Sequence, residues 1–362
     1  MSKKRRRDPS TIDTQLVEIY EDLANESEVI RLKAAASLLS KFSPANSPTK
    51  DQILGVLTRL VRGLCSSRKA ARLGFSIALT EFLVQTHGRP EKDVQPQLDS
   101  QEVIETLKKQ TIAQGDSSGN VLFDFLSTSV LIELQEAKNH DFGRLFGAEA
   151  VIKSRVIFCP NTSIEPWTQI LDVILELGEK RTWLRKECGW VLYNVVEILG
   201  KHNDYIQLLV DKISEHGFTK TPEGVAIWLR AQSVWPSVRF PEGSWHGNDP
   251  LHRKELKNLA NVLREGPSSK PGQQIEVETV TQKGNLSPDL HFAWEVVIGR
   301  VLDEQRSEAS KLRKKTRNPT FHEFWNEAVD GTIPFKSILP LLILKQTACF
   351  LLHLLISENI GA

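Results

Sequence analysis

The stretch from Asp51 to His87 constrains the fold of this chain more than any other part of the sequence. Apolar residues recur at steps of three and four over 53–64 and again over 70–83, and this spacing places them on one face of an α-helix. The short polar break between the two runs ends at Ser67, whose hydroxyl is expected to cap the second helix. Gly74 lets a neighbouring helix approach closely. Two helices that share an apolar seam are the unit of an α-helical repeat array.

Helical spacing continues through most of the chain. It predicts helices, separated by short polar breaks, at 12–23, 27–42, 103–112, 142–156, 167–178, 183–199, 206–213, 222–234, 251–263, 292–302 and 321–329. In the second of these, we expect Ser27 to cap the helix and Val29 and Leu32 to face inward. The sequence therefore predicts an all-α fold, an armadillo- or HEAT-like helical repeat superhelix, although no exact sequence period supports the repeat.

The chain has 362 residues, which is longer than one compact core usually covers, so two lobes or a repeat array are expected. Composition divides it into five predicted segments. These are a basic disordered tail (1–10), the helical repeat array (11–235), a loop-rich segment with one helix (236–290), further helices (291–331) and an atypical apolar tail (332–362).

Charge and cysteine usage argue against a protein that binds nucleic acid or membrane through its overall charge, and against a secreted, disulfide-bonded protein. The net charge of +1 provides no global attraction to nucleic acid or membrane, so any basic surface must be local. The four cysteines have no CxxC spacing and are expected to be reduced, two or three of them buried, which suits the cytosol or nucleus. The basic start is followed by polar residues, so no secretory signal is predicted.

Three blocks of sequence carry a family resemblance. They are RLVRGLCSSRKAARLGFSIALTEFL at 59–83, HDFGRLFGAEAVIKSRVIF at 140–158 and KRTWLRKECGWVLYNVV at 180–196. In order and spacing they resemble the N-terminal part of the DNA polymerase phi family, also called DNA polymerase V or Myb-binding protein 1A, over roughly residues 10–331. The resemblance implies a nucleolar protein that associates with ribosomal DNA, controls its transcription and takes part in ribosome assembly.

The family name makes polymerase chemistry the first activity to test. Two-metal nucleotidyl transfer needs carboxylates that hold two cations about 4 Å apart. The candidates are Glu21 with Asp22, Asp289, and Asp303 with Glu304, each on or beside a predicted helix with polar neighbours. They form no such constellation. We therefore predict no catalytic residues, no metal site and no cofactor. The segment GPSSKPG at 266–272 also lacks the residue order of a phosphate loop.

Two basic clusters favour a binding role instead. Arg59, Arg62, Arg68, Lys69 and Arg72 surround one turn between helices, and Arg181, Arg185 and Lys186 lie at the start of another helix. In a repeat array such turns line one edge, where they would neutralise phosphates of ribosomal DNA or pre-ribosomal RNA. The alternative is a solvated face paired with Glu81 and other acids. No motif for base-specific recognition is present.

A third basic run opens the chain. Lys3, Lys4, Arg5, Arg6 and Arg7 are typical of a nuclear localisation signal that importin recognises. The alternative is a solvated tail without a receptor. The predicted location is the nucleus and nucleolus, with nucleolar proteins as further partners and no membrane association.

Tryptophan and cysteine side chains were considered as further functional groups. At helical spacing Trp190 and Trp294 are expected in the core, whereas Trp245 lies in a loop and is as suited to a surface role as to packing. Cys65 is expected to be a packed thiol, although neighbouring Arg68 and Lys69 would lower its pKa if they lay against it.

Two apolar stretches fit neither the helical pattern nor the family. They are 121–135 and 332–362, and for 332–356 a translated intron or a frame error is the favoured explanation. Codons for 357–362, read two bases later, can encode the Arg-Lys-Tyr-Trp-Gly segment that the family has there. The alternative is a genuine hydrophobic helix that caps the array.

The predicted function is thus a non-enzymatic nucleolar scaffold that associates with ribosomal DNA and regulates its transcription and ribosome biogenesis. Two alternatives stay open. One is a DNA-directed DNA polymerase, as the family name suggests, and the other is a nuclear transport adaptor, a class that also uses helical arrays.

Overall fold

The computed structural model describes residues 13–87, 98–112, 128–158, 163–200, 202–264, 291–309 and 319–328. Within these ranges the chain forms thirteen α-helices and no strand, which confirms the all-α prediction. The basic tail at 1–10, the first part of the apolar stretch at 121–127, the polar stretch at 266–285 and the apolar tail at 332–362 lie outside the described residues. The predicted boundaries of the five segments stay a prediction.

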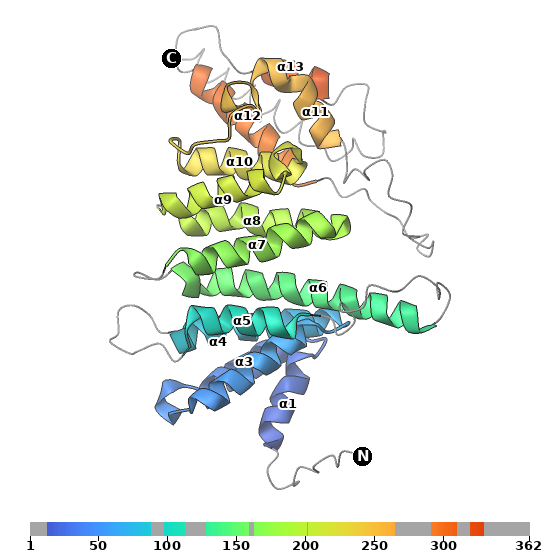
Figure 1. Cartoon of the computed structure of the whole chain (residues 1–362), viewed down its shortest axis with the longest axis vertical. Coiled ribbons are helices and arrows are strands. Elements are labelled where there is room, and N and C mark those ends of the chain that lie inside the picture. Colours follow the sequence, from blue (N-terminus) through green and yellow to red (C-terminus); the bar gives the residue numbers. More distant parts are fainter. Residues whose placement is uncertain are drawn as a thin grey trace, which may run out of the picture. The chain divides into compact units, whose positions relative to one another are not determined.

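The chain forms two compact units, Met1–Leu177 and Gly178–Ala362, and the boundary falls in the last turn of α7. Unit 1 contains α1 (Thr14–Leu23), α2 (Glu28–Lys41), η2 (Pro44–Asn46), α3 (Lys50–Leu64), α4 (Lys69–His87), α5 (Ser100–Gln110), α6 (Thr128–Ser154), η3 (Val156–Phe158) and most of α7 (Glu165–Lys180) (Figure 1). In this unit α3 packs on α4, and both pack on α6.

The pair α3 and α4 has the apolar seam that the sequence predicts. Thr49 and Gln52 form a capping box that begins α3, with each side chain bonded to the other residue's backbone amide. The side chains buried in the seam are Ile53, Leu57, Leu60, Val61, Leu64, Phe75, Ala78, Leu79, Phe82 and Leu83. Gly63 lies against Phe75 so closely that a β-carbon there would overlap the ring. The two helices are therefore fitted to each other by shape as well as by hydrophobicity.

Two predictions for α2 are wrong. Val29 and Leu32 are 60% and 47% exposed, because α2 packs on α1 and α4 with a different face, the one that carries Ala34, Ala35 and Leu38. The Ser27 side chain makes no capping bond. Its backbone amide donates instead to Oδ1 of Asn25 at 2.9 Å, so the loop between α1 and α2 folds on itself before the helix begins.

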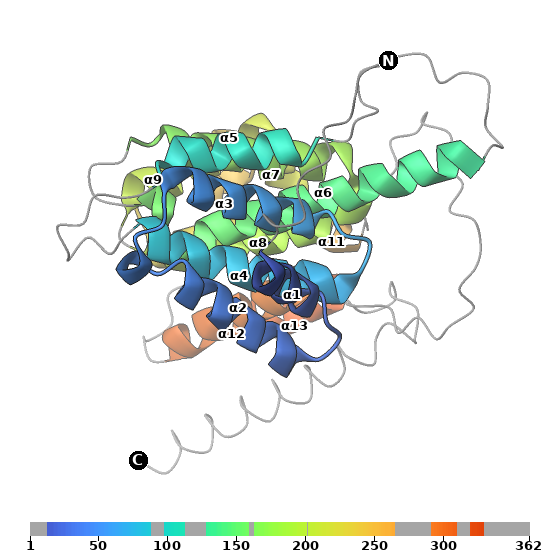
Figure 2. The same cartoon turned by 90° about the horizontal axis from the view of Figure 1, so that it is seen from below.

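The helix α6 is longer than the prediction of 142–156, because it begins at Thr128 and takes in the second part of the apolar stretch. In both views its N-terminal part extends past its neighbours (Figure 2). Two glycines allow its C-terminal half to pack closely. A β-carbon at Gly143 would overlap Sγ of Cys65, and one at Gly147 would overlap the side chain of Leu107.

Unit 2 contains η4 (Thr182–Leu184), α8 (Arg185–Leu199), α9 (Asn203–Glu215), η5 (Phe218–Lys220), α10 (Pro222–Val234), η6 (His246–Asn248), η7 (Arg253–Glu255), α11 (Leu256–Arg264), α12 (Ala293–Ala309) and α13 (Phe321–Ala328) (Figure 1). Here α10 packs on α8 and α12, and α11 packs on α13. No described helix of the chain is both long and apolar enough to cross a membrane.

The segment between α10 and α11 packs across unit 2 through its aromatic residues. Phe240 stacks on the fully buried Trp228, with ring centroids 3.8 Å apart. The indole nitrogen of Trp228 donates to the carbonyl of Asn248 at 3.2 Å. Trp245 is 3% exposed and donates to the carbonyl of Thr219 at 3.2 Å. Trp245 is thus a packing residue, because its polar atom has a partner in the fold.

Candidate nucleic-acid interface

The predicted basic cluster of unit 1 surrounds the turn between α3 and α4. Arg59 and Arg62 lie on the last turns of α3, and Arg68 directly precedes α4. Lys69 begins α4, and Arg72 follows one turn later. All are exposed except Arg72, which is half-buried. The structure therefore brings the five cations together, as the sequence suggests, but what their side chains contact limits what they can bind.

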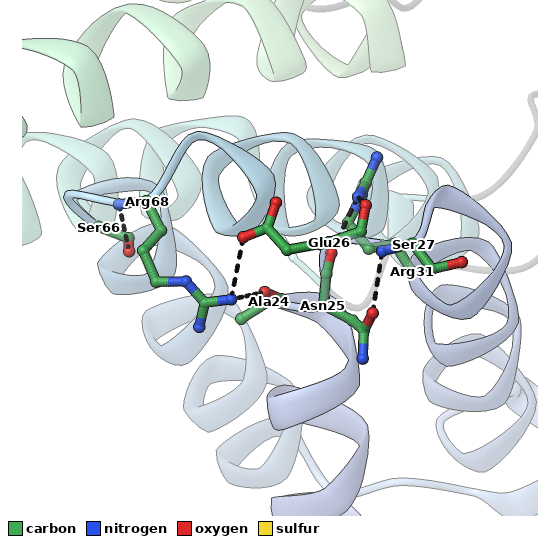
Figure 3. Close-up of polar contacts among 7 residues, drawn as sticks. All are labelled: Ala24, Asn25, Glu26, Ser27, Arg31, Ser66 and Arg68. Atoms are coloured by element: carbon green, nitrogen blue, oxygen red, sulfur yellow. Dashed lines mark hydrogen bonds and ion pairs between the residues drawn. The ribbon is translucent and has the colours of Figure 1, made fainter.

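Arg68 holds the loop between α1 and α2. Its Nη2 donates to the carbonyl of Ala24 at 2.6 Å and lies 3.3 Å from a carboxylate oxygen of Glu26 (Figure 3). Ala24 ends α1, and the last carbonyls of a helix have no partner within the helix. The backbone amide of Arg68 donates to Oγ of Ser66, not the predicted Ser67, at 3.2 Å. Arg68 is thus part of the scaffold as well as of the surface.

Arg31 of α2 supports the same loop from the other side (Figure 3). Its Nη1 donates to the carbonyls of Asn25 at 2.9 Å and Glu26 at 2.7 Å, and the residue is only 8% exposed. Gly74 of α4 makes room for this arrangement, since a β-carbon there would overlap the carbonyl oxygen of Leu23. Arg68 and Gly74 therefore hold the end of α1 against α4, and Arg31 holds the loop that follows α1.

The other arginines of the cluster also contact their own chain. The guanidinium of Arg72 lies 4.5 Å from the centroid of the Phe142 ring and donates to the carbonyl of Ser66 at 2.7 Å, and burial lowers its pKa. Arg59 lies over Tyr20, and Arg62 donates to the side chain of Gln110 at 2.7 Å. Of the acids expected to pair with the cluster, Glu26 forms an ion pair with Arg68.

Lys69 differs from these arginines. It is exposed, and its side chain has no hydrogen bond or ion pair to any residue that the structure describes. Arg62 is also exposed, and its side chain donates to the neutral amide side chain of Gln110. These two cations have the most freedom to contact a phosphate without disturbing the fold.

The second predicted cluster lies in unit 2, before and at the start of α8. The Nε of Arg185 donates to the carbonyl of Gly178 at 3.1 Å, and its guanidinium lies 5.6 Å from the Phe218 ring centroid. Arg181 and Lys186 are half-buried. Because the two clusters belong to different units, a continuous basic stripe stays a prediction.

The prediction that Trp190 lies in the core is wrong. Trp190 is 47% exposed, whereas Trp294 is 3% exposed as expected. The helix α8 buries the face that carries Cys188, Leu192, Val195 and Leu199, so the indole at position 190 lies on the opposite side. The helical period itself contained this signal, because 190 is out of phase with 188, 192 and 195.

The carboxylates that were considered for polymerase chemistry do not assemble among the described residues. Glu21 and Asp22 are exposed on α1, Asp303 is exposed on α12, and Asp289 lies outside the described ranges. Within those ranges no group of three or more His, Cys, Asp or Glu residues is arranged to hold a metal ion.

Cys65 is a packed thiol, as predicted. It is half-buried, and burial raises its pKa to about 11, while the charge of Arg144 acts in the opposite direction. The neighbouring Arg68 points toward the α1–α2 loop, so it does not activate the thiol. Cys65 is therefore not a nucleophile at neutral pH.

Comparison with known proteins places these features in a family. The sequence model described as DNA polymerase phi matches residues 55–338, which is most of the chain. The chain belongs to the DNA polymerase phi family. No solved structure matches it significantly.

Three curated relatives are similar to this member of the family. The rDNA transcriptional regulator pol5 of Schizosaccharomyces pombe is 28% identical over 326 residues, which cover 88% of this chain and 29% of the relative. The rDNA transcriptional regulator POL5 of Saccharomyces cerevisiae is 30% identical over 354 residues, or 86% and 32%. A Myb-binding protein 1A-like protein of Danio rerio is 27% identical over 234 residues, or 63% and 16%. The chain spans less than a third of the length of the two fungal relatives.

Two of the three blocks that resemble the family meet within unit 1. The block at 59–83 spans the second half of α3 and most of α4, and the block at 140–158 lies in the part of α6 and η3 that packs on them. The contacts of Phe142 with Arg72 and of Gly143 with Cys65 join the two blocks. Their residues therefore explain how unit 1 is built before they explain any binding.

Proposed function

We propose that the protein is a non-enzymatic nucleolar scaffold that associates with ribosomal DNA and regulates its transcription and ribosome biogenesis. The observation that carries the proposal is membership of the DNA polymerase phi family together with two relatives named rDNA transcriptional regulators. The packed helices of the described residues support the scaffold part of the proposal. The proposal concerns the whole protein, and the two fungal relatives are about three times as long as this chain.

We also propose that the helices form an armadillo- or HEAT-like superhelix. Support comes from the succession of packed pairs within each unit, α1 with α2 and α3 with α4 in unit 1, and α8 with α10 in unit 2. Such arrays bind partners along extended surfaces, which suits a scaffold.

Direct contact with ribosomal DNA or pre-ribosomal RNA is tested best with Lys69 and Arg62. A double variant, Lys69→Glu with Arg62→Glu, is expected to weaken binding to duplex ribosomal DNA and to reduce the slope of log K against log salt by about 2, because two phosphate contacts are lost. Affinity is measured by fluorescence anisotropy from low to moderate salt. Arg68 and Arg72 are left intact because they hold the fold.

A matched control is Lys33→Glu with Lys153→Glu, which changes two lysines of unit 1 outside the cluster. This control is expected to leave the salt slope unchanged. If the wild type shows no salt-sensitive binding, or if both double variants lose affinity equally, the α3–α4 turn makes no phosphate contact and a scaffold that binds only proteins is preferred.

Nuclear import is tested with the basic tail. Replacing Lys3 to Arg7 with alanine is expected to reduce nuclear accumulation of a tagged protein too large for passive entry, because importin recognises the positive charges. Appending an unrelated basic signal to the alanine variant is the control and should restore accumulation. Undiminished accumulation of the alanine variant would show that another segment directs import.

The polymerase activity that the family name suggests is tested by primer extension with the purified chain, with and without magnesium. We expect no extension in either condition, since two-metal chemistry needs carboxylates that converge. Magnesium-dependent extension that is lost in an Asp303→Ala or Glu21→Ala variant would overturn the non-enzymatic proposal.

A further inference from the structure

An aromatic surface in unit 2 is not used by the features described so far. Trp190 and Tyr193 lie three residues apart on α8, and Phe292 directly precedes α12. The rings of Trp190 and Tyr193 are 5.8 Å apart and nearly parallel, with 20° between their planes. Phe292 completes the cluster, with its ring 5.2 Å from Trp190 and 5.7 Å from Tyr193. We call these three residues the α8 aromatic face.

Trp190 is the most exposed of the tryptophans that the structure describes. Trp167 and Trp228 are fully buried, Trp294 is 3% exposed and Trp183 is 38% exposed, whereas Trp190 is 47% exposed. The other two rings of the α8 aromatic face are half-buried and support the indole from one side. An indole that neighbouring rings hold in place, and a large part of which is still exposed to water, is suited to stacking against another flat ring.

The position of Phe292 is fixed by a buried polar pair. Its ring stacks on His291, at 4.7 Å between centroids. Nδ1 of His291 accepts from the amide of Ala293 at 3.1 Å, so Nε2 carries the ring proton and donates to Oε1 of Glu223 at 3.1 Å. Glu223 is 4% exposed at the start of α10. The α8 aromatic face is therefore pre-organised by a contact between the start of α10 and the start of α12.

Cations flank the α8 aromatic face at both ends. Lys186 lies four residues before Trp190, on the same side of α8 and within the first turn, where the helix dipole adds positive potential. At the other end the guanidinium of Arg230 lies 5.7 Å from the Tyr193 ring centroid and pairs with Glu197 at 3.0 Å. Glu187 is exposed beside Lys186, so the charge near the rings is balanced rather than strongly positive.

We propose that the α8 aromatic face binds unpaired nucleotides, with a base stacked on Trp190 and Lys186 in contact with the adjoining phosphate. A flat, open indole suits a nucleobase, because every base has a π-face and stacking does not depend on sequence. Lys186 lies one helical turn from Trp190, on the same side of α8. A duplex hides its base faces, so it cannot use this site. The site is separate from the duplex contact proposed at the α3–α4 turn.

The test measures binding of the whole chain to three fluorescent probes by anisotropy: an unstructured RNA 12-mer, the DNA of the same sequence, and the duplex form of that DNA. Trp190→Ala is expected to weaken binding to the single strands about tenfold, because one stacked base is lost. Trp190→Phe keeps a stacking ring and should lose less than threefold. Binding to the duplex should be unchanged in both variants.

Lys186→Gln separates the phosphate contact from the stacking contact. It is expected to reduce the slope of log K against log salt for single strands by about 0.7, whereas Trp190→Ala leaves that slope unchanged. Leu32→Ala is the matched control, since Leu32 is as exposed as Trp190 but lies in unit 1, and it should change nothing. Circular dichroism confirms that each variant is folded.

The two single-stranded probes identify the source of the nucleotides. Equal affinity shows a site for any unpaired strand, and tighter binding of the RNA shows an RNA site with a contact to the 2′-hydroxyl. Either result supports the proposal. Single-strand affinity that is the same for the wild type and a folded Trp190→Ala variant overturns it, as does a wild type that binds no single strand. If the single-strand proposal is overturned but the wild type still binds the duplex, the proposed contact at the α3–α4 turn is unaffected.

Discussion

The α3–α4 turn of unit 1 and the α8 aromatic face of unit 2 both combine cations with an apolar helix, but they expose different groups to solvent. At the α3–α4 turn the arginines bend back onto their own chain, where Arg68 and Arg72 bind carbonyl oxygens. At α8 the core is complete without Trp190, and an aromatic ring is left at the surface instead. At the α3–α4 turn the cations thus build the fold, and at α8 an aromatic ring stays at the surface.

The arginine contacts at the α3–α4 turn have their physical origin at helix ends. The last carbonyls of a helix lack partners, and an arginine nearby can satisfy them from a neighbouring element. This happens repeatedly in both units: Arg68 binds the carbonyl of Ala24 after α1, Arg144 that of Thr111 after α5, Arg185 that of Gly178 in α7, and Arg264 those of Glu327 and Ala328 in α13. A basic residue near a turn is therefore weak evidence for a phosphate site.

The largest effect is expected in the seam below the α3–α4 turn. Phe75→Ala should lower the free energy of unfolding by about 3–5 kcal/mol, because Phe75 is 4% exposed and fills the space left by Gly63. Denaturant titration monitored by circular dichroism measures it. A loss below about 1 kcal/mol would mean that the seam can close over the cavity, and that the turn above it is less rigid than the packing indicates.

The next effect tests whether the arginines near the turn are structural. Arg31→Met keeps the length of the side chain but removes both bonds to the α1–α2 loop, so unfolding should become easier by about 2–3 kcal/mol. Nucleic-acid binding by the folded variant should not change. If the variant is as stable as the wild type but binds nucleic acid more weakly, Arg31 contributes to binding. The contrast between the α3–α4 turn and the α8 aromatic face would then be lost.

The pair that supports the α8 aromatic face predicts a pH dependence. Burial alone would raise the pKa of Glu223, but hydrogen bonds from His291, the backbone and Thr221 outweigh it and hold the pKa below 4.5. Stability from ionised Glu223 is therefore present above about pH 4.5 and is lost as the pH falls through the lower pKa of the folded state. Glu223→Gln should cost about 1–2 kcal/mol at neutral pH.

The same variant should also lose less stability than the wild type between about pH 5 and about pH 3. Thermal unfolding across this range provides the comparison, with Glu197→Gln as a control, since Glu197 is exposed and paired at the surface. Parallel pH curves for the wild type and Glu223→Gln would show that folding does not lower the pKa of Glu223.

The smallest effects compare two neighbours at the α3–α4 turn. Arg68→Ala should destabilise the chain by about 1 kcal/mol through the lost bond to Ala24, a modest value because the side chain is partly exposed. Lys69→Ala should change stability by less than about 0.5 kcal/mol. Urea titration measures both variants. Equal losses of unfolding free energy would show that Arg68 stabilises the fold no more than Lys69 does.

Particular residues show how far the sequence could be interpreted alone. The periodicity of 53–64 and 70–83 predicted α3, α4 and their buried seam correctly, because an amphipathic helix must bury its apolar face. The same reasoning failed for Val29 and Leu32, since α2 has apolar residues on more than one face and only its neighbours decide which face is covered. The composition of the basic turn predicted the position of its cations but not the carbonyls that they bind.

Helical periodicity and family motifs are local properties of the chain, so the all-α fold, most of the helices and the family could be predicted from the sequence. Which cations bind carbonyls inside the fold, and that Trp190 stays at the surface, depends on the packing of the helices. Arg31 and Trp190 show the reason. Whether a side chain meets a carbonyl, a ring or water depends on elements distant in sequence, so its role becomes defined only when the helices pack.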